Sequence, residues 1–178
     1  MRIVSLLPSA TEIVYVLGLD EELVGVTHEC NWPPAVGQRC QRRHRRTLLL
    51  EWGDPLFNAG HWLPGMVQLA GGSPVLAQPG ADSVRFTWDQ VRDAAPEVVV
   101  FSPCGYDLDA AVTDGRALAD RPELADAEWW AVDADSYFVR PGPRLVDGAE
   151  ILASILHPDQ MGWPRPGAAA RLKGRSSI

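Results

Sequence analysis

The sequence predicts an α/β protein with a doubly wound, mostly parallel sheet flanked by helices. The first observation is that short apolar runs, such as Val98–Phe101, carry no polar interruption, as strands buried on both faces require. The second is that stretches with helical spacing separate these runs. The clearest is Pro143–Leu156, whose apolar residues recur along one side. Strands that alternate with helices indicate parallel pairing.

The N-terminal segment predicts a strand, a helix and a second strand over residues 1–36. Residues 2–7 form the first apolar run, and Pro8 then introduces a helix. Ser9 is placed to cap that helix and Glu12 follows three residues later, which is the pattern of a capping box. Gly18 is expected to end the helix, and Leu23–Val26 is the second strand.

Residues 37–46 differ from the rest of the chain. The run GQRCQRRHRR contains five of the chain's 16 basic residues. It fits a solvated linker, a junction between two segments or a nucleic-acid patch. Because no aromatic platform or fold motif accompanies the run, we interpret it as a junction and expect no nucleic-acid binding.

The strand and helix pattern resumes over residues 47–160 and predicts the larger body of the protein. The expected strands are Leu48–Glu51, Ser73–Leu76, Val98–Phe101 and Trp129–Val132, and the expected helices are Trp62–Ala70, one that Thr87 or Asp89 caps, Leu108–Leu118 and Pro143–Leu156. Residues 161–178 combine prolines, glycines and alanines with scattered basic residues. We expect them to form a disordered tail.

Composition limits the classes of function. The net charge of −7 argues against nucleic-acid binding, and no apolar run is long enough to span a bilayer. The cysteines, Cys30, Cys40 and Cys104, form no disulfide framework. No export signal is visible at the N-terminus, so the sequence alone predicts a cytoplasmic protein.

Aromatic and polar residues follow the predicted strands at the edge where open parallel sheets bind ligands. They are His28, Glu29 and Trp32, then Trp52, Asp54, Phe57, His61 and Trp62, then Cys104, Gly105 and Tyr106, and finally Asp133, Asp135, Tyr137, Phe138 and Arg140. Broad aromatic faces suit a large, partly apolar guest, and the arginine suits a carboxylate, phosphate or amide. Packing of these aromatics between sheet and helices is the alternative.

Enzyme signatures are absent, so we expect a protein that is not an enzyme. The sequence has no nucleophile elbow, no phosphate-binding loop and no dinucleotide fingerprint. A small enzyme that uses Cys104 as a nucleophile, or a metal held by His28 and His61, is a weaker alternative. We predict no catalytic residue, resident cofactor or metal ligand.

The segments RIVSLLPSATEIVYVLGL and LVGVTHECNWPP resemble the opening of cobalamin-binding proteins of the type III periplasmic-binding-protein class. The later segments LLLEWGDPLFNAGHWLPGMVQLAGG, FTWDQVRDAAPEVVVFSPCGYDL and AVDADSYFVRPGPRLVDGAEILASILHP resemble successive parts of the second lobe of that family. Together these segments cover residues 2–34 and about 47–158.

The resemblance implies a protein of two lobes, of which the second is Rossmann-like, with cobalamin or an iron chelate bound between them. The loaded protein would dock on an ABC permease outside the cytoplasmic membrane. By position it implies ligand contacts from the second lobe at Trp52, His61, Trp62, Cys104, Tyr106, Tyr137, Phe138 and Arg140, and from the first lobe at Ser9, Thr11, His28 and Glu29.

The chain departs from the family pattern because the rest of the first lobe and the bridging helix have no counterpart. The arginine-rich run stands in their place. A strand–helix–strand unit is too small to bury its own apolar faces. It must therefore pack on the second lobe, pair with another chain as a homodimer, or remain loose. A remnant that folds but no longer binds solute is thus a second hypothesis.

Overall fold

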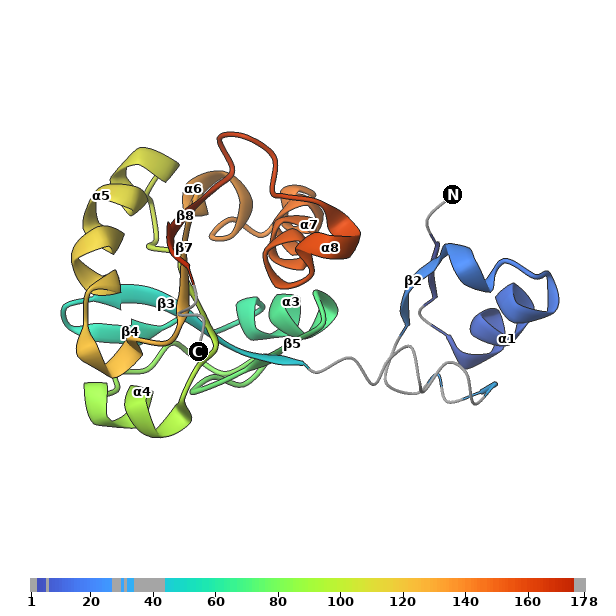
Figure 1. The fold of residues 1–178 in the computed structure, drawn as a ribbon, viewed down its shortest axis with the longest axis horizontal. Helices are drawn as coiled ribbons and strands as arrows, with labels where there is room; N and C mark the ends of the chain where they lie inside the picture. The colour runs from blue at the N-terminus through green and yellow to red at the C-terminus, as the bar shows by residue number, and fades with distance from the viewer. Residues whose placement is uncertain (1–2, 6, 27–29, 31, 34–43, 175–178) are drawn as a thin grey trace. The chain divides into compact units, whose positions relative to one another are not determined.

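The computed structural model describes residues 3–5, 7–26, 30, 32–33 and 44–174, as two compact units. The first unit is Met1–His44 and the second is Arg45–Ile178. Figure 1 shows the ribbon of each unit.

The first unit contains strand β1 (Ile3–Ser5), helix α1 (Pro8–Val16), the short 3-10 helix η1 (Asp20–Glu22) and strand β2 (Leu23–Val26). β1 and β2 pair in parallel, in agreement with the predicted order of elements. Gly18 adopts a positive φ of 67° just beyond α1, as expected for a residue that ends a helix.

The predicted capping box of α1 is wrong. Leu7 occupies the cap position without a side-chain hydrogen bond, because Pro8 begins the helix and places Ser9 inside its first turn. Proline suits this position since its missing N–H would have no partner there.

The second unit is built on a mixed, mostly parallel six-stranded sheet. Its strands are β3 (Arg45–Gly53), β4 (Leu56–Asn58), β5 (Gly72–Pro74), β6 (Val98–Phe101), β7 (Glu128–Val132) and β8 (Ala169–Lys173). The order is β4-β3-β6-β7-β8, with β5 also paired to β3. The pairs of β3 with β5, β3 with β6, and β6 with β7 are parallel, while β4 and β8 run antiparallel to their neighbours. The predicted fold class is confirmed.

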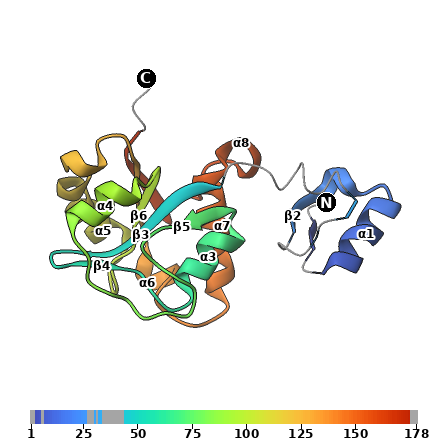
Figure 2. The same ribbon diagram turned by 90° about the horizontal axis from the view of Figure 1, so that it is seen from below.

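Helices cover both faces of this sheet. One layer contains α3 (Leu63–Leu69), α6 (Ala134–Tyr137), α7 (Arg144–Leu156) and α8 (Pro158–Met161), and the other contains α4 (Trp88–Ala94), α5 (Leu108–Ala119) and the 3-10 helix η2 (Pro122–Leu124). Figures 1 and 2 show α4 and α5 on one side of the strands and α3 and α7 on the other.

Alternate residues of the central strands supply two separate cores. Val98, Val100 and Trp130 point toward α3 and α7, where Ile151 and Leu152 are buried. Leu48, Leu50, Val99, Phe101 and Trp129 point the other way, toward α4 and α5. Burial on both faces explains why VVVF contains no polar residue.

Two predictions about the ends of the second unit are wrong. Residues 169–173 form the edge strand β8 where we expected disorder, because β7 offers a free edge with which they pair. Strand β3 begins at Arg45, so Arg45 and Arg46 belong to the sheet. Arg45 lies 2.6 Å from Glu128, and Arg46 lies 3.7 Å from Glu97. Residues 37–43 of the predicted junction lie outside the described residues.

Within the described ranges, the helices are too short or too polar to cross a bilayer.

Candidate functional site

The carboxyl ends of β3 and β6 bring two aromatic side chains together. The rings of Trp52 and Tyr106 meet edge to face, with 5.6 Å between their centres and 89° between their planes. Trp52 remains 36% exposed, and Tyr106 is half-buried. This arrangement presents an aromatic step to a ligand and gains from the quadrupoles of the two rings.

A polar pair lies beside this step, after β7. The Asp135 backbone N–H donates to the Tyr106 carbonyl at 3.0 Å, which ties the loop after β7 to the loop after β6. Nη2 of Arg140 lies 2.8 Å from both carboxylate oxygens of Asp135. The guanidinium of Arg140 is therefore already paired with the Asp135 carboxylate at this edge of the sheet. We name Trp52, Tyr106, Asp135 and Arg140 the carboxyl-edge cluster.

The phenol of Tyr106 has a partner of its own. Its hydroxyl donates to a carboxylate oxygen of Asp114 at 3.1 Å. This hydrogen bond, and then the negative charge of Asp114, raise the pKa of Tyr106 above its usual value. The Tyr106 hydroxyl consequently stays protonated and holds one ring of the aromatic step toward α5.

His61 and Trp62 form a second group, at the start of α3. Their ring centres are 5.9 Å apart, and His61 adopts a positive φ of 58°. Nε1 of Trp62 donates to the Phe138 carbonyl at 2.9 Å. Both residues line an open, mainly apolar groove of about 980 Å³ between α3 and α7, beside Leu69, Leu145 and Val146.

The segment that carries His61 is held in place by close backbone contacts. Gly60 packs so tightly that an added Cβ would lie 2.3 Å from the Ser83 nitrogen. The Gly60 N–H donates to the Ser83 hydroxyl at 3.0 Å, and that hydroxyl donates to Glu51 at 2.7 Å. The buried Asn58 side chain bonds the Val84 N–H at 2.7 Å. A rigid loop therefore positions His61.

The other predicted contacts of the second unit are placed differently. Phe138 is fully buried in the core between the sheet and α7, so it does not line the edge, in contrast to the prediction. Tyr137 is half-buried, and the Arg165 guanidinium lies 5.1 Å from its ring centre. Cys104 is exposed as a free thiol.

Of the predicted contacts in the first unit, Thr11 makes hydrogen bonds inside that unit. Its hydroxyl is buried, 2.8 Å from the Ser5 hydroxyl and 3.0 Å from the Cys30 sulfur. Ser9 is exposed on α1. His28 and Glu29 lie outside the described residues.

The sequence places Asp135 among the edge residues without predicting it as a ligand contact, and it does not single out Asp114. Asp135 carries a detectable signal because it follows a strand, two residues after Asp133, on the same edge. Asp114 carries none, since its link to Tyr106 depends on the first two turns of α5. Among the residues that the structure describes, no three His, Cys, Asp or Glu side chains are grouped to hold a metal ion.

Comparison with known proteins supplies the fold relationship. No family model matches the sequence, and no curated protein matches it either. The vitamin B12-binding protein of Vibrio cholerae superposes with a TM-score of 0.52 at 19% identity, over 89% of this chain and 97% of that one. A haem-binding protein of Pseudomonas aeruginosa gives 0.55 at 18% identity, over 96% of this chain and 66% of that one.

An ABC transporter substrate-binding protein of Listeria monocytogenes gives a TM-score of 0.56 at 9% identity, over 84% of this chain and 62% of that one. The chain thus spans about two thirds or less of the length of two of these three structures. The protein shares the α/β fold of the type III periplasmic binding proteins that carry vitamin B12, haem or iron.

Proposed function

We propose that the protein is the solute-binding component of an ABC importer and that its solute is a corrinoid of the cobalamin type. The carrying observation is the carboxyl-edge cluster, where an exposed aromatic step stands beside an arginine that an aspartate already pairs. The fold likeness supports the broader part of the proposal, because the similar structures are binding proteins.

The charges of the edge favour a neutral ligand. Four carboxylates lie in the segments that follow β3, β6 and β7, at Asp54, Asp107, Asp133 and Asp135. An anion that approaches Arg140 also meets Asp135 within hydrogen-bond distance of the same nitrogen. A haem propionate or an anionic iron chelate would therefore be repelled, whereas the amide groups of a corrinoid hydrogen-bond to carboxylates without that cost.

The aromatic step supplies the apolar part of recognition. A macrocycle that stacks on Trp52 covers the exposed part of the indole and the adjacent edge of Tyr106. Buried aromatic anchors commonly contribute 2 kcal/mol or more to binding, which is roughly a thirtyfold change in affinity. Trp52 is thus the residue whose removal should matter most.

The test is equilibrium dialysis of the full chain against cyanocobalamin, haem and a ferric catecholate chelate, read by visible absorbance. We expect cyanocobalamin to be retained most strongly and Trp52→Ala to weaken that retention at least about tenfold. Trp163→Ala is the matched control, because Trp163 is also exposed but packs on Trp130 instead of lying in the cluster.

Each alternative outcome has a distinct meaning. Tighter binding of haem or the ferric chelate than of cyanocobalamin refutes the corrinoid assignment and keeps solute binding. Asp135→Asn provides a further check, since removing this carboxylate should favour anionic ligands at Arg140. Absence of binding by all three ligands at high micromolar concentration refutes the solute-binding proposal.

One observation favours the second candidate, a remnant that folds without binding solute. Among the first-unit residues whose burial is described, Ser5, Thr11 and Cys30 are buried, while Leu7, Ile13, Val16 and Leu17 are more than half exposed. The exposed apolar side chains of α1 are therefore not covered by this unit's described residues. Limited proteolysis tests this candidate, because early cleavage of the first unit, with no ligand bound, is its expected signature. A second copy of the chain that covered α1 as a homodimer would instead protect it.

A further inference from the structure

A second hollow lies on the α4 and α5 side of the sheet, and none of the four residues of the carboxyl-edge cluster lines it. Its volume is about 610 Å³, within the range of small-molecule sites. It is lined by the β3–β4 hairpin (Gly53, Asp54, Pro55, Leu56), by Arg85, Phe86, Thr87 and Trp88 before and at the start of α4, and by Ala117, Leu118 and Arg121 at the end of α5. We name it the hairpin hollow.

The walls of the hairpin hollow are fixed by backbone contacts. Phe57 and Arg85 form an antiparallel bridge, and the Phe86 N–H donates to the Leu56 carbonyl at 3.3 Å. On the far side, a Cβ added to Gly53 would lie 2.5 Å from a methyl carbon of Leu118, so the hairpin backbone packs directly on α5. The β3–β4 hairpin therefore contacts both the segment before α4 and helix α5, which together bound the hollow.

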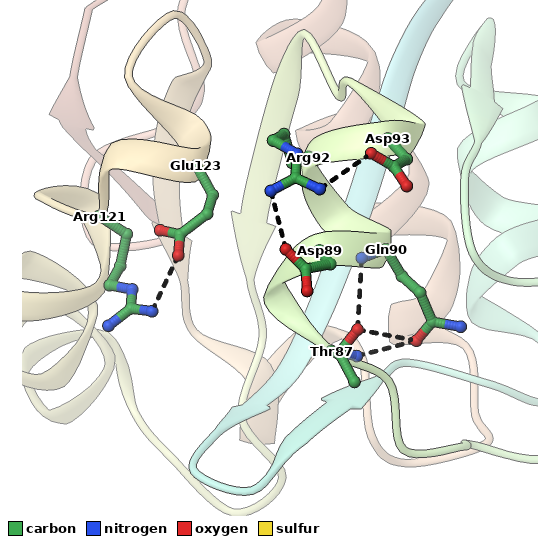
Figure 3. A network of polar contacts seen from close by, with 7 residues as sticks. All are labelled: Thr87, Asp89, Gln90, Arg92, Asp93, Arg121 and Glu123. Atoms are coloured by element: carbon green, nitrogen blue, oxygen red, sulfur yellow. Dashed lines mark hydrogen bonds and ion pairs between the residues drawn. The ribbon is translucent and has the colours of Figure 1, made fainter.

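The start of α4 is equally well defined. Thr87, one of the two predicted cap residues, caps α4 in a capping box with Gln90: the Gln90 N–H donates to the Thr87 hydroxyl, and the Gln90 side chain accepts from the Thr87 N–H at 2.9 Å (Figure 3). The cap fixes the backbone on both sides of Trp88. Trp88 in turn lies beneath Arg121, whose guanidinium carbon is 4.4 Å from the ring centre.

The chemistry of the hollow is that of an apolar floor with cationic sides. Leu56, Phe86, Trp88 and Leu118 belong to or pack on the core of this face. Nη2 of Arg121 lies 3.1 Å from Glu123 (Figure 3), which leaves Nη1 free of any hydrogen bond among the described residues. Arg85 is exposed and its guanidinium lies 6.0 Å from the Phe57 ring.

Arg85 differs from the other arginines of this region in having no acidic partner. Arg92 is paired with Asp89 at 2.7 Å and with Asp93 at 3.4 Å (Figure 3), and Arg121 is paired with Glu123. Among the described residues no carboxylate lies within 4.0 Å of the Arg85 guanidinium. In a chain of net charge −7, an unpaired arginine beside an aromatic hollow is a specific attraction for an anion.

We propose that the hairpin hollow binds a small amphiphilic carboxylate, with its apolar body on Phe86 and Trp88 and its carboxylate at the unpaired Arg85. The body replaces water on the apolar floor, and the carboxylate gains charge-assisted hydrogen bonds from the guanidinium group. Asp54, which also lines the hollow, disfavours ligands with more than one negative charge. This site shares no lining residue with the carboxyl-edge cluster, and its proposed ligand is not the corrinoid.

The test uses 2-naphthoate as the probe and its neutral amide, 2-naphthamide, as the matched ligand. Binding to the ¹⁵N-labelled full chain is followed by NMR through the indole N–H signal of Trp88, identified with a Trp88→Phe variant. We expect the Trp88 signal to shift with naphthoate. The affinity for the amide should be at least about threefold weaker, because the amide lacks the ion pair that the carboxylate forms with the exposed Arg85. Raising the salt concentration should weaken naphthoate and leave naphthamide unchanged.

Variants separate charge from local structure. Arg85→Glu reverses the charge and should weaken naphthoate roughly tenfold or more, while Arg85→Gln should weaken it about threefold. Arg92→Gln is the control, because Arg92 lies on α4 one turn beyond Trp88 without lining the hollow, so the variant should leave affinity unchanged. Equal affinity for acid and amide, insensitivity to Arg85→Glu, or absence of a Trp88 shift at millimolar naphthoate overturns the proposal.

Discussion

Gly148 lies where α7 passes closest to α6. A Cβ placed on this glycine would lie 2.3 Å from the Tyr137 carbonyl oxygen and 2.8 Å from the terminal methyl of Met66. The Met66 side chain is flexible and can move, whereas the carbonyl belongs to the backbone of α6. Since ordinary carbon–oxygen contacts are about 3.3 Å or longer, Gly148→Ala requires the two helices to separate by roughly 1 Å.

Two opposing effects decide the sign of this substitution. Alanine is better than glycine in a helix by about 1 kcal/mol, which alone would stabilise α7. Overpacking a well-packed core costs about 1–3 kcal/mol, and the upper part of that range, about 2–3 kcal/mol, applies here because the obstacle is backbone. The net expectation is a loss of about 1–2 kcal/mol. For a unit of about 130 residues this corresponds to a fall in Tm of roughly 4–8 °C.

Differential scanning calorimetry measures that fall. Gly142→Ala is the control because no atom lies within 4 Å of its added Cβ, so its Tm should change little. The displaced α6 should also weaken the hydrogen bond from Trp62 to the Phe138 carbonyl, visible as a shift of the Trp62 indole N–H signal. An unchanged or raised Tm for Gly148→Ala would show that the close approach of α6 and α7 is not the constraint described here.

Three further substitutions test the rest of the second unit. Glu128→Gln leaves Arg45, now 2.6 Å from that carboxylate, without its counter-charge and should cost about 3 kcal/mol in chemical denaturation. Phe138→Ala should cost about 3–5 kcal/mol by the same measurement because the ring is fully buried. Asp114→Asn should lower the pKa of Tyr106, read from phenolate absorbance. Because the pKa of Tyr106 is raised in the folded protein, this hydrogen bond stabilises the fold below about pH 10, and that stability is lost as the pH rises through the pKa of folded Tyr106. The Asp114→Asn variant should lack this pH-dependent contribution.

The sequence predicted best those strands whose burial is complete on both faces. Val98–Phe101 has the predicted bounds because every one of its side chains is buried. Strand β8 was missed because its sequence, AARLK, is only partly buried and becomes a strand by pairing with β7. The start of β3 was missed because Arg45 and Arg46 form ion pairs in the sheet with Glu128 and Glu97, which are distant in sequence.

The candidate site was predicted only where position after a strand decides which way a side chain points. Trp52 lies at the end of β3 and Tyr106 in the loop after the adjacent strand β6, and their rings meet at this edge of the sheet. Phe138 lies six residues beyond β7, where the turn of α6 directs it into the core. Direction after an intervening helix depends on packing, which the spacing of residues does not reveal.

The aspartates of the carboxyl edge explain why aromatic residues are left to meet a ligand. Asp107 accepts the Ala110 N–H at 2.9 Å and Asp133 accepts the Ser136 N–H at 3.0 Å, so each caps the helix that follows its strand. Such caps satisfy helix N–H groups that would otherwise compete for anions at this edge. With those donors occupied, the surface offered beside them is the Trp52–Tyr106 step. The proposed corrinoid, with its broad apolar face and neutral amide groups, fits these occupied donors better than an anion would.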